Sequence, residues 1–192
     1  MTLRARPRLS SLRAQLLYRA LHLALTRASK PAFRLLQFSV QRDHVHLIVE
    51  AADRVTLWRG MQGLAVRLAR AVNRVLRRRG SVWGDRYHRR DVRTPRDLRN
   101  LLRYVLMNHR KHAQTPVEVH QRRSELDPCS SAAWAGVWDD RAESRAAQLR
   151  ERATRLGLRC PVRWPRTWLA RRGWRRHGLL GLYERPRSTS AR

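Results

Sequence analysis

The chain has 192 residues, and its hydrophobic fraction of 42% is enough for one compact domain with an appended segment. It carries 43 lysines and arginines against 14 acidic residues, and the resulting formal net charge of +29 predicts a polyanionic partner, nucleic acid above all. Its two cysteines lack the spacing of a zinc site or a disulfide framework, and no signal peptide or membrane-spanning stretch is visible. We therefore expect a cytoplasmic protein that has neither a membrane nor a small-molecule substrate as its partner.

The first predicted elements are a short strand and a helix. Residues 2–6 alternate between two kinds of side chain, as a strand does. Ser10 or Ser11 can cap a helix that runs to about residue 28 and is closed by Pro31. The predicted apolar side of this helix consists of Leu12, Leu16, Ala20 and Leu23.

A hairpin and a long helix are predicted next. Residues 32–40 and 44–51 are rich in β-branched, aromatic and leucine side chains, and the polar turn Gln41-Arg42-Asp43 separates them. The following helix is expected from about residue 55 to 78, with Gly80 after its end. Its apolar stripe consists of Leu57, Met61, Leu64, Leu68, Val72 and Val75.

Residues 86–93 predict a further strand, followed by a helix with a clear start. Thr94-Pro95-Arg96-Asp97 combines an N-cap, a proline at the first helical position and an acidic residue at the third. We expect this helix to run from Pro95 to about His112. The first six elements have the order of the split βαβ, or ferredoxin-like, pattern, which is an α+β fold with an antiparallel sheet.

Two histidines lie one residue apart in the second hairpin strand, in the stretch "DHVHLIVE". Because side chains alternate along a strand, His44 and His46 share one face, whereas Val45 and Leu47 share the other. The two imidazoles can both reach a divalent cation, with a third ligand from elsewhere. They can equally be polar residues on a half-exposed sheet face, and the pair alone does not decide between these interpretations.

The last helix of this half adds Tyr104 and Asn108, which share one edge at spacing i, i+4. A tyrosine there is ordinarily a packing residue, and an asparagine is ordinarily exposed. In the functional interpretation, Asn108 is an oxygen ligand of a two-histidine metal site and Tyr104 is a nucleophile beside it. Phosphoryl transfer needs such a cation and such a phenol.

These residues resemble the HUH single-tyrosine transposases and, within them, the REP-associated tyrosine transposases. The resemblance rests on "DHVHLIVE", "MQGLAVRLARAVNR" and "VWGDRYHRRDVRTPRDLRNLLRYVLMNHRKH" in this order, and it covers roughly residues 1–115. It implies a transposase-like catalytic domain over 1–115, with the tyrosine helix on the sheet face opposite the two packing helices. Residues 116–192 would form a basic, tryptophan-rich C-terminal accessory segment, with a charged helix near 142–158.

The resemblance also implies a reaction. His44 and His46 would bind Mg²⁺ or Mn²⁺, with Asn108 as the third ligand. Tyr104 would cleave single-stranded DNA at hairpin-forming repeats, leaving a 5′-phosphotyrosine link and a free 3′-hydroxyl that can later reverse the reaction. Many relatives have histidine where this chain has Arg90. They act as monomers or homodimers, and a nucleoid-associated location in a bacterium is implied.

Two groups of residues are candidates for DNA binding. Aromatic residues interleaved with arginines suit unstacked bases beside a phosphate track, and this group consists of Trp83, Arg86, Tyr87, His88, Arg90 and Arg93. Trp83 can instead close the core. The long helix adds a basic stripe that includes Arg67, Arg70 and Arg74, which is either a docking surface or a solvated helix face.

Two other functions remain open. The chain can be a non-catalytic, domesticated nucleic-acid-binding protein on the same fold, whose binding would depend on salt but not on Tyr104 or a metal. An RNA-binding module on a split βαβ scaffold is less favoured, because the aromatic pattern of such modules is missing from the central strands.

Overall fold

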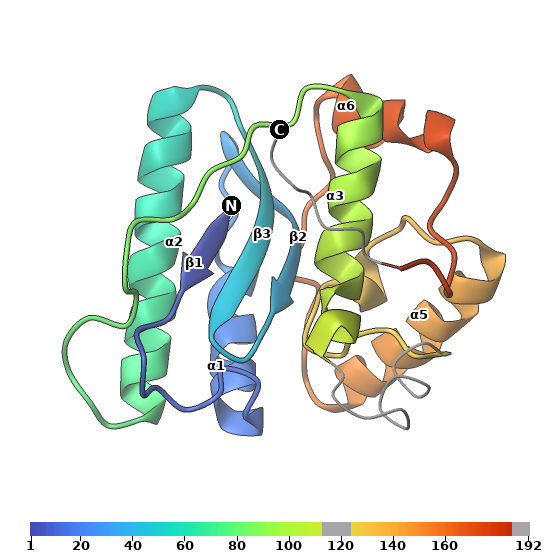
Figure 1. Cartoon of the computed structure of the whole chain (residues 1–192). Coiled ribbons are helices and arrows are strands. Elements are labelled where there is room, and N and C mark those ends of the chain that lie inside the picture. The colour runs from blue at the N-terminus through green and yellow to red at the C-terminus, as the bar shows by residue number, and fades with distance from the viewer. Residues whose placement is uncertain (113–123, 186–192) are drawn as a thin grey trace.

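The computed structural model describes residues 1–112 and 124–185. Helices and strands combine in an α+β arrangement, in which a small antiparallel sheet lies between helices on its two sides (Figure 1). This confirms the predicted class. The strands are β1 (Thr2–Arg4), β2 (Phe33–Val40) and β3 (His44–Ala51), and the helices are α1 (Gln15–Thr26), α2 (Arg54–Val75), α3 (Pro95–Met107), α5 (Asp140–Arg155) and α6 (Trp168–Arg171), with short 3₁₀ turns at Asn108–His112, Ala132–Trp134 and Gly173–His177.

The sheet has the order β1-β3-β2, so β3 is its central strand. The predicted hairpin is confirmed, and it pairs Ser39 with His46, while β1 pairs Thr2 with the same histidine. One irregularity interrupts the hairpin, because Leu35 pairs with Val49 but Gln37 pairs with Ile48, which leaves Leu36 as an extra residue. Such a β-bulge changes which face the following side chains occupy.

Two apolar cores lie on the two faces of the sheet. The first is formed by β2, β3, α1 and α2, and it buries Val45 and Leu47 of the central strand. The second is formed by α3 and the C-terminal segment, and it buries Ile48 of the same strand together with Leu102. Figure 1 shows α2 and α3 on opposite sides of the sheet. The strand alternation therefore assigns each side chain of β3 to one of the two layers.

The predicted strand over residues 86–93 is not formed. Within this segment His88 forms an isolated bridge with Thr2 of β1, and a second isolated bridge joins Trp83, ahead of the segment, to Ala5, just after β1. From one bridge to the other, the N-terminal chain spans three residues, from 2 to 5, and the opposite segment spans five, from 83 to 88. Because the opposite segment has two extra residues, a continuous ladder of hydrogen bonds cannot form. The sheet of the described residues thus has three strands, and the fourth strand of the predicted pattern is reduced to a bridged edge.

The helix predicted to begin at Ser10 or Ser11 begins at Gln15, and Ala14 is its N-cap without a side-chain hydrogen bond. The predicted apolar side is wrong as well, since Leu16 and Leu23 are 73% and 57% exposed. The buried side of α1 consists of Leu17, Tyr18, Leu21, His22, Ala24 and Leu25. Leu12 is fully buried, but it enters the first core from the loop before the helix.

The other two predicted helices of this half are present, although α3 ends at Met107 and residues 108–112, predicted to continue it, form a 3₁₀ turn. In α2 the residues Met61, Leu64, Leu68 and Val72 are buried, as the stripe predicts. In α3 the Thr94 side chain accepts a hydrogen bond from the Asp97 backbone N–H, and a proline occupies the first turn. An N-cap of this kind stabilises a helix by about 1 kcal/mol. The cap therefore fixes where α3 starts and, through the 3.6-residue repeat, where Tyr104 lies.

Charged groups hold the C-terminal segment against the rest of the fold. Glu184 accepts hydrogen bonds from Arg99 of α3 at 2.6 Å to each carboxylate oxygen. Glu50 of β3 accepts from the Thr167 backbone N–H at 2.9 Å and from its hydroxyl at 2.7 Å, beside the start of α6. Burial works to raise the pKa of each carboxyl, but these hydrogen bonds outweigh it and hold both pKa values below their ordinary range.

None of the helices described in residues 1–112 and 124–185 has the length and apolar character needed to span a membrane.

Candidate functional site

The two histidines of β3 converge on one point. His44 and His46 are both buried, with exposures of 9% and 7%, and their Nε2 atoms lie 3.0 Å apart. Their rings are nearly perpendicular, at an interplanar angle of 76°. The strand pleat places both side chains on the face that carries α3, as the sequence predicts.

The outer nitrogen of each ring is fixed by a neighbour. His44 Nδ1 lies 2.7 Å from a carboxylate oxygen of Asp43, and His46 Nδ1 lies 3.0 Å from the hydroxyl of Thr2. Because a carboxylate only accepts, His44 donates from Nδ1, and in the tautomer that this contact selects the lone pair is on Nε2. A carboxylate that orients a histidine in this way is a common support for metal-binding imidazoles.

The pair fits a divalent cation on the chemistry of its donors. Adjacent ligands of an octahedral ion with bonds of about 2.0–2.1 Å lie roughly 3 Å apart, which matches the Nε2 separation. Without a cation, a proton on His46 Nε2 would bridge the two rings, and the Thr2 hydroxyl would then donate to His46 Nδ1. The described residues contain no group of three histidine, cysteine, aspartate or glutamate side chains suited to a metal, so a third ligand from them would be of another type.

Asp43 supplies negative charge behind the pair. Partial burial works to raise its pKa, but the hydrogen bond with His44 and the positive charge of Arg4 outweigh burial and hold the pKa below its usual range. Asp43 therefore stays a carboxylate at neutral pH. An ionised partner makes the His44 ring a stronger ligand than an isolated imidazole.

Tyr104 lies against this pair within the same chain. Its ring centroid is 5.2 Å from that of His46, in an edge-to-face arrangement. Helix α3 positions it by packing Leu102, Val105 and Leu106 into the second core, which turns Tyr104 toward β3. Burial raises the pKa of the Tyr104 phenol, so the hydroxyl keeps its proton at neutral pH until a reacting group or a cation removes it.

Asn108 follows one helical turn later, at the C-cap of α3, and its side chain is only 2% exposed. The prediction that it shares an edge of the helix with Tyr104 agrees with this placement, and its burial excludes an ordinary surface asparagine. Among the described residues, no hydrogen bond joins its side chain to either histidine. Its ligand role stays a prediction.

Further buried polar groups surround the histidines on the same face. Ser39 pairs with His46 across the hairpin, and Gln41 donates to the Ser39 hydroxyl at 2.6 Å. Both are almost completely buried. Such a cluster of buried polar side chains is unusual for a structural core, where apolar residues pack better.

The first group of predicted DNA-binding residues borders this site. His88 exchanges two backbone hydrogen bonds with Thr2, whose hydroxyl contacts His46. The arginines of the group, Arg86, Arg90 and Arg93, are exposed. Trp83, in contrast, is half-buried on the first core and donates its indole N–H to the Ala65 carbonyl at 2.8 Å, as expected of a residue that closes the core.

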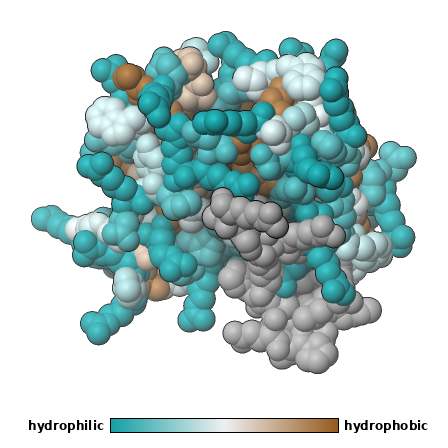
Figure 2. Space-filling view, turned by 45° about the horizontal axis from the view of Figure 1, so that its top comes forward, coloured by the Kyte–Doolittle hydropathy of each residue, from teal (hydrophilic) through white to brown (hydrophobic). Residues whose placement is uncertain are grey.

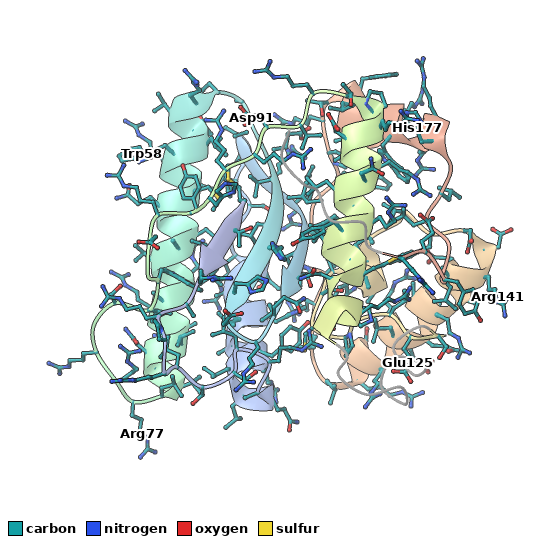
Figure 3. The ribbon with its side chains drawn as sticks, in the orientation of Figure 1. Trp58, Arg77, Asp91, Glu125, Arg141 and His177 are labelled. Atoms are coloured by element: carbon teal, nitrogen blue, oxygen red, sulfur yellow. The ribbon has the colours of Figure 1, made fainter. Side chains whose placement is uncertain are left out.

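The second group lies away from the histidines, because α2 covers the opposite face of the sheet (Figure 1). Arg70 and Arg74 are exposed and Arg67 is half-buried. Figure 3 shows the long side chains of this helix and of Arg77 after its end reaching outward. In Figure 2, hydrophilic side chains cover most of the visible face and hydrophobic ones show only in small patches. The stripe does not line the tyrosine site, and its role in DNA binding stays a prediction.

Sequence reasoning missed Thr2 and Asp43, which hold the two imidazoles. Asp43 directly precedes His44, and a carboxylate next to a candidate ligand is a signal that was available. Thr2 gave no such signal, since only the pairing of β1 with β3 places it opposite His46.

Comparison with known proteins agrees with this geometry. The family described as IS200-like transposase matches residues 2–108, which is more than half of the chain and includes both histidines, Tyr104 and Asn108. No curated protein and no solved structure gives a significant match. A transposase family implies DNA as the partner, in keeping with the formal net charge of +29. The chain belongs to the IS200-like transposase family.

Proposed function

We propose that the protein is a metal-dependent strand transferase that cleaves and rejoins single-stranded DNA at hairpin-forming repeats. The observation that carries this proposal is the packing of the Tyr104 ring on His46, whose Nε2 atom meets that of His44 at 3.0 Å. A candidate nucleophile and two converging metal-type donors thus lie in contact within one chain. The site acts within a single protomer, whether the protein is a monomer or a homodimer.

The proposed step transfers a phosphoryl group to Tyr104. The phenol oxygen bonds to phosphorus, the bond from phosphorus to the 3′ oxygen breaks, and that oxygen leaves as a 3′-hydroxyl with the proton that Tyr104 gives up. A 3′-hydroxyl of another strand can reverse the exchange and return the proton to Tyr104. The number of phosphodiester-type bonds is unchanged, so no nucleotide cofactor is required.

The remaining residues have supporting roles. Mg²⁺ or Mn²⁺, held by His44 and His46 with Asn108 as the third ligand, would polarise the scissile phosphate. Asp43 and Thr2 hold the two imidazoles in place through their Nδ1 atoms. The exposed arginines of residues 86–93 carry the strand past the site, since they lie on the edge that pairs with β1.

A labelled-strand experiment tests the proposal. The full chain is incubated with Mg²⁺ or Mn²⁺ and a set of single strands that form hairpins, and covalent protein–DNA adducts are resolved under denaturing conditions. Because the link is to a 5′ phosphate, a label at the 3′ end should move with the protein and a label at the 5′ end should not. Chelation of the metal should remove the adduct.

Substitutions then identify the nucleophile. Tyr104→Phe should abolish the adduct while DNA binding persists, and Tyr183→Phe, at an exposed tyrosine outside the site, should leave it unchanged. An adduct that survives in Tyr104→Phe would exclude this residue as nucleophile. If the folded, metal-bound protein binds the hairpins in a salt-dependent manner but forms no adduct with any of them, the protein is a non-catalytic DNA-binding member of the family.

A further inference from the structure

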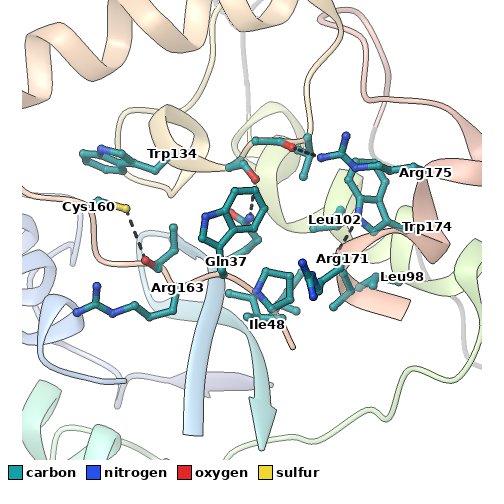
Figure 4. A pocket seen from close by; sticks show the side chains of 18 of the residues that line it. Gln37, Ile48, Leu98, Leu102, Trp134, Cys160, Arg163, Arg171, Trp174 and Arg175 are labelled. Atoms are coloured by element: carbon teal, nitrogen blue, oxygen red, sulfur yellow. Dashed lines mark hydrogen bonds between the residues drawn. The ribbon is translucent and has the colours of Figure 1, made fainter. Parts of the chain in front are cut away.

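A cavity lies between the sheet, α3 and the C-terminal segment. It has a volume of about 340 Å³, which is within the range of ligand-binding pockets. Its apolar floor comes from the second core and includes Ile48, Leu98 and Leu102. Figure 4 shows Cys160 and Arg163 at one end of this cavity and Trp174 and Arg175 at the other.

Tryptophans form part of its walls. Trp174 is buried, and its indole N–H donates to the Ala170 carbonyl at 3.1 Å, so that its ring is held in place. Trp164 is 76% exposed, although Arg34 anchors its backbone carbonyl at 2.8 Å. Trp174 therefore closes the wall, whereas the exposed ring of Trp164 offers a flat stacking surface beside the cavity.

Arginines line the same cavity without acidic partners. Among the described residues, no ion pair involves Arg163, Arg171 or Arg175. Arg150 is different, because it pairs with Glu143 at 2.8 Å. Three uncompensated guanidinium groups around an apolar floor predict an occupant that has an anionic part and a flat apolar part.

We propose that this cavity binds one unstacked nucleotide of single-stranded DNA. Its base stacks on the exposed ring of Trp164 over the apolar floor, and its phosphate meets the arginines that have no acidic partner. This assignment of the cavity rests on the proposed function in one respect, because it takes single-stranded DNA as the substrate. A nucleotide combines the two chemical features that the cavity requires, whereas duplex DNA keeps its bases stacked and out of reach.

The cavity is separate from the tyrosine site. Helix α3 lines it with Leu98 and Leu102, whereas Tyr104 on the same helix packs on His46. Since successive residues of a helix are rotated by about 100°, Leu102 and Tyr104 point to opposite sides of α3. A nucleotide in the cavity therefore strengthens binding of the strand and does not take part in the bond exchange.

Cys160 makes a footprinting test possible in the unaltered protein. Its thiol is exposed at the cavity, whereas burial and the nearby Asp127 raise the pKa of Cys129 to about 12, which keeps that thiol protonated. N-ethylmaleimide labelling of each cysteine is followed by peptide mass spectrometry, with and without a saturating single-stranded oligonucleotide. We expect the oligonucleotide to slow labelling of Cys160 at least about fivefold.

A matched pair of tryptophan variants tests the stacking surface. Trp164→Ala should weaken single-strand binding at least about fivefold, the lower end of the range for loss of one base–aromatic stack. Trp58→Ala removes a comparably exposed tryptophan from α2 on the other side of the sheet and should leave binding unchanged (Figure 3). Because Trp164 is mostly exposed, its removal should not impair folding, and thermal unfolding serves as the check.

The outcomes separate this proposal from the proposed function. An oligonucleotide that binds tightly and forms the Tyr104 adduct, but leaves Cys160 labelling unchanged, would overturn the cavity assignment alone. Equal protection by inorganic phosphate would assign the cavity to a small anion and overturn it too. Protection of Cys160 in Tyr104→Phe, where no adduct can form, would support the cavity even if the transfer reaction failed.

Discussion

The two faces of the three-stranded sheet bury different kinds of residue. Toward α1 and α2 the central strand presents Val45 and Leu47, which join a continuous apolar core. Toward α3 the same strand presents His44 and His46, and buried Ser39 and Gln41 lie beside them. The first face has the composition that stability favours, whereas the second keeps costly buried polar groups. The contrast shows that β3 stabilises the fold mainly with one side, and it is the polar side to which we assign the proposed reaction.

The sharpest test of this contrast compares two neighbours on β3. Leu47→Ala should reduce the free energy of unfolding by about 2–5 kcal/mol, since it leaves a cavity in the first core. His46→Ala should reduce it by only about 1 kcal/mol, the usual scale of one hydrogen-bonded contact, but should abolish binding of Mn²⁺. Urea unfolding and calorimetric titration with Mn²⁺ give the two quantities. Equal destabilisation by both variants would mean that the histidine face is structural.

Acid should loosen the α3 side selectively. The pKa of Glu184 is lower in the folded state than in the unfolded state, where it is about 4.3. The ionised carboxylate therefore stabilises the fold at higher pH. This stabilisation is lost as the pH falls through the folded-state pKa. Glu184→Gln should therefore cost about 1.5–3 kcal/mol at neutral pH, and the cost should shrink as the pH falls below the unfolded-state pKa. Urea unfolding across this pH range measures the difference. A cost that does not depend on pH would contradict an ionic origin.

The contact between Asp43 and His44 can be weakened while both histidines stay in place. Asp43→Asn keeps the size of the side chain but removes the charge beside His44, and it should weaken Mn²⁺ binding by about 10–100-fold. Asp85→Asn, at an exposed aspartate in the loop after α2, is the matched control. Unchanged Mn²⁺ affinity in Asp43→Asn would show that Asp43 does not orient the ligand.

The smallest expected effects distinguish two glycines of α2, of which Gly60 faces the first core and Gly63 faces solvent. A Cβ at Gly60 would lie 2.2 Å from the buried Phe33 ring, whereas one at Gly63 would meet nothing within 4 Å. Gly60→Ala should therefore destabilise the fold by about 1–3 kcal/mol through overpacking. Gly63→Ala should stabilise it by roughly 0.5–1 kcal/mol because alanine is the better helix former. Thermal unfolding compares them, and similar shifts for both would contradict tight packing of Phe33.

Local patterns predicted much of this molecule. The hairpin, α2 and α3 follow from alternation, the 3.6-residue repeat and the Thr94 cap, all of which lie within a few consecutive residues. The predicted placement of Tyr104 on the histidine side agrees with its contact with His46. Part of the site was accessible because its residue types and spacing are themselves local.

Features that depend on distant segments were not predictable in this way. The apolar side of α1 was wrong partly because the C-terminal segment also covers this helix, where His22 Nε2 lies 2.8 Å from the Arg159 carbonyl oxygen. The strand over 86–93 failed because its pairing with β1 is interrupted. The cavity behind α3 is built from residues more than one hundred positions apart, and no sequence pattern connects them.

The bulge in β2 has a consequence for that cavity. In a regular strand, consecutive side chains point to opposite faces, so only one of two neighbours can reach a given layer. The extra residue in β2 lets Leu36 and Gln37 both line the cavity, while Leu35 before them and Phe38 after them remain in the first core. Deleting Leu36 would restore the regular pairing and take one wall away from the cavity. The shape of this proposed nucleotide subsite is thus set by a one-residue phase shift in the backbone, which a comparison of side chains alone would overlook.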